Sequence, residues 1–109
     1  MAFNAELAER IRGRLKERAG FTEKKMFGGV TFLLNGNMCC GVRVEEIIVR
    51  LPPSEGDQAL SQPNTKQFVL NGRPLKGWIL VGTKSLETDP DLAKWVDRAA
   101  DFVGTLPPK

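Results

Sequence analysis

Apolar residues recur at helical spacing near the start of the chain. Leu7, Ile11 and Leu15 lie four positions apart, which places them on one face of a helix. Asn4 precedes them and favours the N-cap position, where its side chain accepts a hydrogen bond from the first turn. Gly20 is predicted to end this helix, because glycine tolerates the left-handed backbone conformation that is common there.

The most regular helical pattern lies near the other end of the chain. Its apolar positions recur at intervals of three and four residues: Leu92, Trp95, Val96, Ala99, Phe102 and Val103. This pattern predicts a helix with Asp89 as its N-cap and Pro90 as its first residue. Gly104 is predicted to end it, with Leu106 folding back on the helix end.

Between the two helices, short apolar runs separated by turn residues predict strands. Residues 24–42 hold two such runs, joined at Asn35-Gly36, the dipeptide most typical of a tight hairpin turn. With these two residues at the centre of the turn, Phe32 is expected opposite Cys39. Both faces of the hairpin are apolar. Either helices cover part of each face, or one face contacts another molecule.

Three further apolar runs predict three more strands, at residues 47–51, 67–70 and 78–82. Pro52 and Pro53 stop the first of them, and Ser54 can begin a short helix that extends to about residue 61. The predicted order is therefore α-β-β-β-α-β-β-α. This order favours an α+β fold of two layers, with a mainly antiparallel sheet, in a single domain of residues 1–109.

Composition excludes several kinds of chemistry. The chain has no histidine and no tyrosine, which removes Ser-His and Cys-His nucleophile pairs, an imidazole base and histidine metal sites. We therefore expect a non-enzymatic protein with no catalytic residues, no metal and no cofactor. No apolar run approaches the roughly 20 residues of a membrane span, and no export signal is visible. The expected location is the reduced cytoplasm.

The chain has two cysteines, Cys39 and Cys40, and they are adjacent. Neighbouring residues of a strand point to opposite faces, so we expect one buried thiol and one half-exposed thiol. Adjacent Cα atoms lie about 3.8 Å apart, which is shorter than the usual span of a disulfide of about 4.4–6.8 Å. A disulfide between them is not expected.

Positive charge is concentrated at the start of the chain. The net charge is +3, and residues 1–25 carry seven basic and four acidic side chains. Arg10, Arg14 and Arg18 lie four residues apart on one stripe of the predicted helix, followed by Lys24 and Lys25. One interpretation is a solvated face with Glu–Arg pairs along the helix. The alternative is a surface on which these five residues contact nucleic acid.

Two other stretches are candidates for anion binding. Gly28-Gly29 could form a phosphate loop, but no GK[ST] motif follows and the next segment is strand-like, so these glycines are predicted to serve the strand. Arg73 and Lys76 flank a proline before Trp78. Lys76 could be a nucleophile or, with Arg73, could bind a small anion in an enzyme site. The alternative is a surface lysine whose stem covers Trp78.

Three motifs resemble the signature stretches of the TfoX N-terminal domain family: KKMFGG at residues 24–29, NGNM at 35–38 and GRPLKGW at 72–78. The opening helix and the closing residues 95–109 fit as well. The resemblance implies an α+β fold similar to that of secretion chaperones. The family is named after regulators of natural competence, which act with a cyclic-AMP receptor-type activator of transcription. Because the resemblance covers nearly the whole chain, we expect a single-domain member without the C-terminal domain of those regulators.

Taken with the missing catalytic groups, the resemblance favours a small regulatory domain that binds protein and is linked to transcription regulation. The expected partner is another protein or a second copy, because a twofold dimer covers an apolar face with one patch. The candidate contact residues lie in the three motifs and the hairpin: Met26, Phe27, Gly28, Gly29, Met38, Cys39, Arg73, Lys76 and Trp78.

Overall fold

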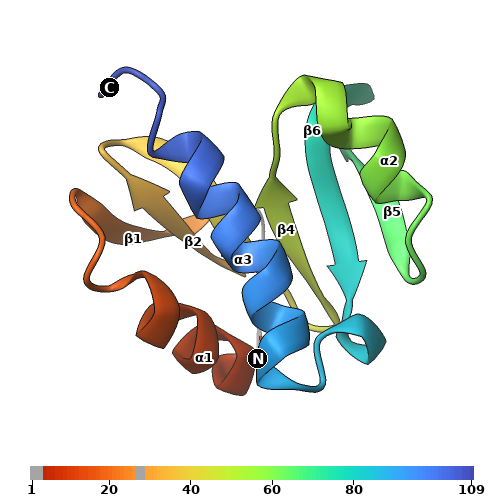
Figure 1. Cartoon of the computed structure of the whole chain (residues 1–109), viewed down its shortest axis with the longest axis horizontal. Helices are drawn as coiled ribbons and strands as arrows, with labels where there is room; N and C mark the ends of the chain where they lie inside the picture. Colours follow the sequence, from red (N-terminus) through yellow and green to blue (C-terminus); the bar gives the residue numbers. More distant parts are fainter. Residues whose placement is uncertain (1–3, 27–28) are drawn as a thin grey trace.

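Three helices lie on one side of a six-stranded sheet in the computed structural model, which describes residues 4–26 and 29–109 (Figure 1). The helices are α1 (Ala5–Leu15), α2 (Gly56–Leu60) and α3 (Asp89–Val103), with short 3-10 turns η1 (Pro53–Glu55) and η2 (Thr83–Ser85). The strands are β1 (Phe21–Met26), β2 (Gly29–Leu34), β3 (Asn37–Val42), β4 (Glu46–Arg50), β5 (Thr65–Leu70) and β6 (Arg73–Gly82).

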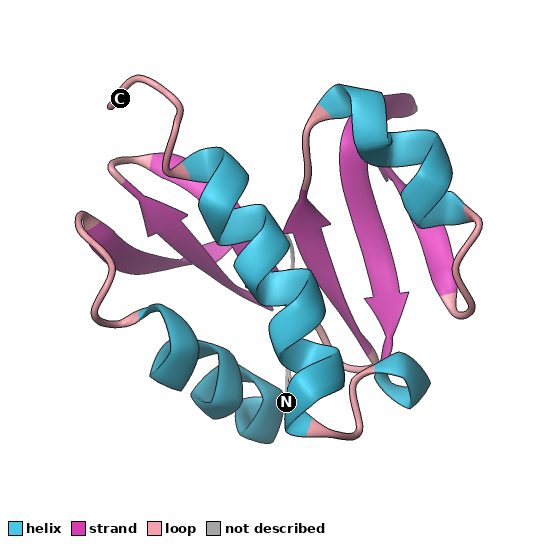
Figure 2. Cartoon of the chain, in the orientation of Figure 1, coloured by secondary structure: helices cyan, strands magenta, loops and turns pink. Residues whose placement is uncertain are grey.

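The sheet is open, with the order β1-β2-β3-β4-β6-β5, and every neighbouring pair of strands is antiparallel. Figure 2 shows the helices in front of the strands, so the molecule has two layers. The predicted α+β class, the antiparallel sheet and the order of elements are confirmed. The structure adds one strand that the pattern did not predict. Five of the six residues of β1 are exposed, so this edge strand has little apolar signal.

The main hydrophobic core lies between the helices and the sheet. Each layer contributes fully buried side chains, including Ile11 and Leu15 of α1, Val96 and Ala99 of α3, and Phe32, Ile47, Val49, Ile79 and Val81 of the sheet. The ring of Phe21 in β1 stacks on that of Phe32, with the centroids 5.8 Å apart. The predicted apolar faces of both long helices therefore form this core.

A smaller apolar cluster occupies the other face of the sheet. Ile48 lies between two core residues of β4 and so points away from the helices. Met38 and Phe68 are buried beside it, and half-buried side chains pack around them: Leu70, Leu75, Trp78 and Leu80. Every residue of β2 and β3 is buried. Neither face of the hairpin is therefore free, and the alternative that one of its faces contacts another molecule is wrong.

The register of the hairpin differs from the predicted one. Asn35 and Gly36 form the turn with φ values of 54° and 84°, as expected for the residues of this dipeptide. However, Phe32 is opposite Cys40 rather than Cys39, because the register shifts between Phe32 and Leu33. Cys39 is the extra residue of a β-bulge in β3. A pattern of apolar residues carries no mark of such an insertion.

The helix ends also differ in detail from the prediction. Thr88, not Asp89, caps α3, because its Oγ1 accepts a hydrogen bond from the backbone N–H of Asp91 at 3.2 Å. Gly104 has an ordinary helical φ of −63°. At the first helix, α1 ends at Leu15, well before Gly20. Gly20 does have a φ of 76°, and its missing side chain makes room for Asn35 at the hairpin turn.

Candidate interaction surfaces

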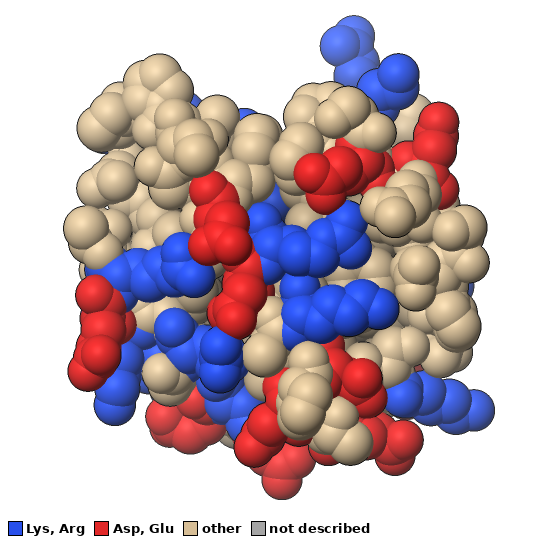
Figure 3. Space-filling model, in the orientation of Figure 1, with Lys and Arg blue, Asp and Glu red and all other residues tan. Residues whose placement is uncertain are grey.

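Three arginines form a stripe that is bound to a matching aspartate stripe on α3. Arg10 and Arg14 lie on α1, whereas Arg18 was predicted on the same helix but lies in the turn after it ends. The pairs are Arg10–Asp89 at 3.2 Å, Arg14–Asp97 at 2.6 Å and Arg18–Asp101 at 3.0 Å. Figure 3 shows blue and red side chains meeting across this face of the molecule. Among the described residues, the expected Glu–Arg pairing along α1 is present only at Arg12, whose guanidinium lies 3.0 Å from Glu9.

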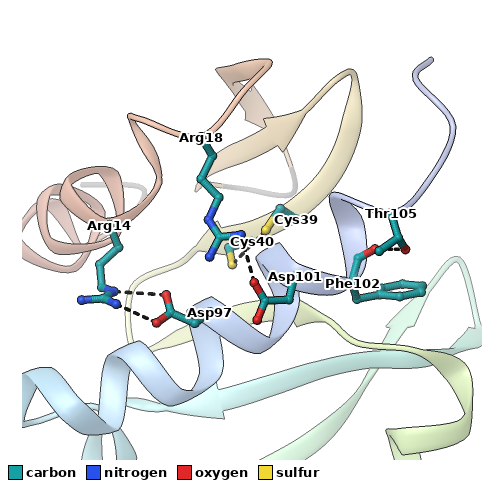
Figure 4. Close-up of polar contacts among 8 residues, drawn as sticks. All are labelled: Arg14, Arg18, Cys39, Cys40, Asp97, Asp101, Phe102 and Thr105. Carbon is teal, nitrogen blue, oxygen red and sulfur yellow. Dashed lines mark hydrogen bonds and ion pairs between the residues drawn. The ribbon is translucent and has the colours of Figure 1, made fainter.

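These ion pairs occupy the arginine guanidinium groups to which a nucleic acid would have to bind. Arg14 donates two parallel hydrogen bonds to Asp97, at 3.2 and 2.6 Å, and this contact raises the pKa of Arg14 (Figure 4). Such two-pronged pairs hold a guanidinium in a fixed direction. A phosphate would have to displace a carboxylate at each of the three positions. The aspartate spacing of eight and four residues along α3 is the sequence signal that could have revealed this pairing.

Strand β1 forms one edge of the sheet and carries uncompensated positive charge. Arg12 of α1 binds Glu23 of this strand through two hydrogen bonds, at 2.7 and 3.0 Å. The hydrogen bonds from Arg12 lower the pKa of Glu23. The neighbouring Lys24 and Lys25 are exposed, and neither has a carboxylate partner among residues 4–26 and 29–109.

The strand pattern predicted that the two cysteines lie on opposite faces of the sheet, with one thiol half-exposed, and this prediction is wrong. Both are fully buried in the main core, and their sulfur atoms are 3.7 Å apart (Figure 4). The bulge at Cys39 turns the two residues to the same side. Both thiols are free. The hydrogen bond between the two thiols, together with burial, raises the pKa of Cys40.

Trp78 lies in β6, within the predicted strand 78–82, and packs in the smaller cluster. Its ring stacks on Phe68 at a centroid distance of 5.9 Å. The guanidinium of Arg50 lies 5.2 Å from the centroid of the same ring, within the range of a cation–π contact. Burial lowers the pKa of Arg50. Arg50 was not among the predicted contact residues, because only the pairing of β4 with β6 brings it opposite Trp78.

A wide irregularity in the pairing of β5 with β6 shapes the segment around Lys76. Gln67 fills it: its side-chain amide donates to the backbone carbonyls of Phe68, Leu75 and Trp78, at 2.9, 2.7 and 3.3 Å. Gly77 has a φ of 85°, and a Cβ there would collide with the carbonyl oxygen of Leu51. Predicted strand 78–82 therefore extends back to Arg73, with a bulge in place of a loop.

Arg73 and Lys76 do not face a recognisable pocket. Both are exposed, and neither is among the residues that line four shallow hollows on the described part of the chain. One of these hollows has a volume of about 360 Å³ and is open and polar, lined by Gln62, Pro63, Asn64, Lys84, Ser85, Asp91, Lys94 and Trp95. Nothing in this geometry supports a desolvated nucleophile at Lys76.

The predicted contact residues do not form one surface. Met26 is 36% exposed at the end of β1, whereas Gly29, Met38 and Cys39 are buried. Phe27 and Gly28 lie outside the described residues. Met38 and Trp78 share the smaller cluster, but Cys39 belongs to the main core on the opposite face. The exposed residues of the set lie on two strands that are not neighbours, Met26 on β1 and Arg73 and Lys76 on β6.

Within the described residues, no group of three or more potential metal ligands occurs. In the same part of the chain, no helix has the length and apolar character needed to cross a membrane.

The fold and surfaces described above define a small α+β domain with an open antiparallel sheet and helices on one face. The family model of the TfoX N-terminal domain matches residues 14–103, so the chain belongs to the TfoX N-terminal domain family. No curated protein and no solved structure gives a significant match.

Proposed function

We propose that this protein is a non-enzymatic regulatory domain that acts by binding protein and contributes to transcription regulation. Membership of the TfoX N-terminal domain family supports this proposal. The observation that carries the binding part is the open sheet, in which β1 and β5 each have a neighbouring strand on one side only within the described part of the chain. An edge strand presents unpaired backbone N–H and C=O groups, which can pair with a strand from another chain.

We propose that β5 is the edge at which two copies meet. Val69 on this strand is 52% exposed, beside the half-buried Leu70. In an antiparallel pair of two β5 strands centred on Phe68, Lys66 would lie opposite Leu70 of the second copy. The two Lys66 side chains would therefore be at opposite ends of the interface, without repulsion between like charges.

Light scattering after size-exclusion chromatography tests this dimer. The expected result is a mass of twice that of the chain, which falls to that of a monomer in Val69→Glu. Val44→Glu is the matched control, because Val44 is 56% exposed in the turn between β3 and β4, away from both sheet edges. A monomeric wild-type protein across all concentrations, or equal loss of the dimer in both variants, would contradict the proposed dimer.

Direct binding of nucleic acid through α1 is the competing function and has less support. Arg10, Arg14 and Arg18 are each paired with an aspartate of α3. We therefore expect fluorescence anisotropy of a labelled DNA duplex to stay flat when the protein is added at low salt. A salt-dependent rise that is lost when the three arginines are replaced by alanine would favour nucleic-acid binding instead.

A further inference from the structure

β1 forms the sheet edge opposite to β5, and the role inferred for it rests on the proposed protein-binding function. Within residues 4–26 and 29–109, β1 pairs only with β2, and five of its six residues are exposed. Its outer edge is therefore a place where an extended chain could add a seventh strand. An edge by itself does not say what would bind, so the choice depends on the charges along it.

The charges on β1 form two groups. Glu23 is held by Arg12 through hydrogen bonds of 2.7 and 3.0 Å, so its charge is compensated within the chain. Lys24 and Lys25 are exposed, with no carboxylate partner among the residues that the structure describes. Because successive residues of a strand point to opposite faces, one lysine lies on each face of the sheet edge.

The other charged surface of the molecule differs from β1 because its arginines are paired with carboxylates. On the face formed by α1 and α3, the three stripe arginines each have an aspartate partner. Among residues 4–26, the cations without an ion pair are thus Lys16, which follows α1, and the two lysines of β1, which lie beside the 36% exposed side chain of Met26. This combination provides backbone groups along the edge, a cation on each face and an apolar contact at the end.

A second copy of β1 does not fit this edge. An antiparallel pair of two β1 strands would bring four lysines together, while the two Glu23 carboxylates are already bound by Arg12. Like charges opposite each other across a strand pair are destabilising. Lysines on an edge strand are also a known means of preventing self-association. A chain with acidic side chains meets no such repulsion.

We propose that the outer edge of β1 binds an extended acidic segment of a partner protein, which adds as a strand with carboxylates on Lys24 and Lys25. Backbone hydrogen bonds provide the pairing, and the two lysines select the sequence. The domain then uses its two edges for different purposes: β5 for a second copy and β1 for the partner.

A defined peptide tests the proposal on the full chain. The probe is a capped six-residue peptide with two adjacent glutamates at its centre, flanked by valine and threonine. Backbone amide NMR signals of β1 are expected to shift on titration, and the affinity is expected to fall about tenfold or more in Lys24→Glu/Lys25→Glu. The same double variant is expected to bind a peptide in which lysine replaces each glutamate. The matched control is Lys76→Glu/Lys84→Glu, which makes the same charge change at exposed positions outside β1 and β5 and is expected to leave the affinity unchanged.

A peptide that carries N-methyl groups on alternate residues separates strand pairing from simple charge attraction. One of the two alternating patterns is expected to abolish binding, because it blocks the N–H groups that face β1. Equal binding of both N-methylated forms, shifts confined to residues outside β1, or no binding at low salt would overturn the proposal. If the β5 dimer is seen by light scattering in the same protein, such a failure concerns β1 alone and leaves the protein-binding function standing.

Discussion

The two cysteines lie side by side in the core because β3 carries an extra residue at Cys39. Their sulfur atoms are 3.7 Å apart, and neither side chain is exposed to solvent. The contact between the thiols and their burial favour the protonated form of Cys40 and so raise its pKa. Because the thiolate is the reactive form of cysteine, this pair is expected to be chemically inert in the folded protein.

Thiol titration checks this expectation. At neutral pH a disulfide reagent such as Ellman's is expected to react with neither cysteine in the native protein and with both after unfolding in guanidinium chloride. The reaction rate should follow the opening of the core rather than the ionisation of an exposed thiol. One equivalent of rapid reaction in the native state would show that one thiol is accessible after all.

Gly13 is a site at which the chain can be stabilised. It lies exposed inside α1, and a Cβ there would have no heavy atom within 4 Å. Gly13→Ala is expected to raise the free energy of unfolding by about 0.5–1 kcal/mol, because alanine restricts the unfolded chain and favours the helix. Chemical denaturation measures this change. Gly77→Ala is the contrasting variant and is expected to destabilise, since its Cβ would collide with the Leu51 carbonyl.

At the scale of elements, α1 is attached to its neighbours by charge as well as by its apolar face. The stripe of arginines reaches α3, and Arg12 reaches β1. Ion pairs at the surface each contribute little, in the range of about 0–1 kcal/mol. Their main effect is therefore on orientation: they set α1 relative to both α3 and the edge of the sheet.

The Arg12–Glu23 pair makes stability depend on pH. The hydrogen bonds from Arg12 lower the pKa of Glu23 in the folded state, so the contribution of the pair is complete above the unfolded pKa of about 4.3 and is lost as the pH falls through the lower folded value. Glu23→Gln is expected to lower the free energy of unfolding at pH 7 by up to about 1 kcal/mol.

That difference from the wild type should shrink as the pH falls from the unfolded pKa of about 4.3 through the lower folded pKa of Glu23, because the wild-type carboxylate then also becomes protonated. Glu17→Gln is the control, because Glu17 is exposed on the neighbouring turn. Denaturant titrations of the three proteins between acid and neutral pH measure the effect. A loss of stability in Glu23→Gln that stays constant down to the lowest pH would rule out the ionic origin.

Gln67 holds together the irregular part of β5 and β6. Its amide group donates to three backbone carbonyls where the pairing of β5 with β6 is irregular. Gln67→Met keeps the length of the side chain but removes the donors, and is expected to cost about 1–3 kcal/mol of unfolding free energy. Gln58→Met on the exposed face of α2 should change stability little. Equal effects of the two substitutions would contradict the role assigned to Gln67.

At the scale of the whole molecule, the sheet has an apolar cluster on each face. The main core contains Trp95, and the smaller cluster contains Trp78. Ile47 and Ile48, adjacent in β4, point into one cluster each, so neither cluster can come apart without disturbing the strands that carry the other. We therefore expect a single cooperative unfolding transition, as is usual for domains of this size.

Single-tryptophan variants measure this cooperativity. In Trp95→Phe the remaining fluorescence reports on Trp78 and the smaller cluster, while far-UV circular dichroism reports on the whole fold. The two denaturation curves are expected to coincide. An earlier transition of the fluorescence would show that the smaller cluster and the β5–β6 pair open first.

The sequence by itself determined the helices, the class of fold and the family. Apolar spacing marks the buried faces of α1 and α3, and Asn35-Gly36 requires the hairpin turn, because both residues must adopt positive φ values. These features depend on residues close together in the chain, which is why the pattern is sufficient. The missing histidine likewise excludes its chemistry without reference to any structure.

Tertiary structure alone decided where the candidate site residues lie. The bulge at Cys39 is an insertion in a strand. The pairing of Arg14 with Asp97 and the contact of Arg50 with Trp78 join segments that are distant in the sequence. The same is true of β1, whose polar residues form a strand only because β2 lies beside them. Local pattern cannot register such contacts, since their energy depends on which strands and helices become neighbours. Among the described residues, the fold therefore left Lys24 and Lys25 without a carboxylate partner at the sheet edge, while it paired Arg10, Arg14 and Arg18 with aspartates of α3.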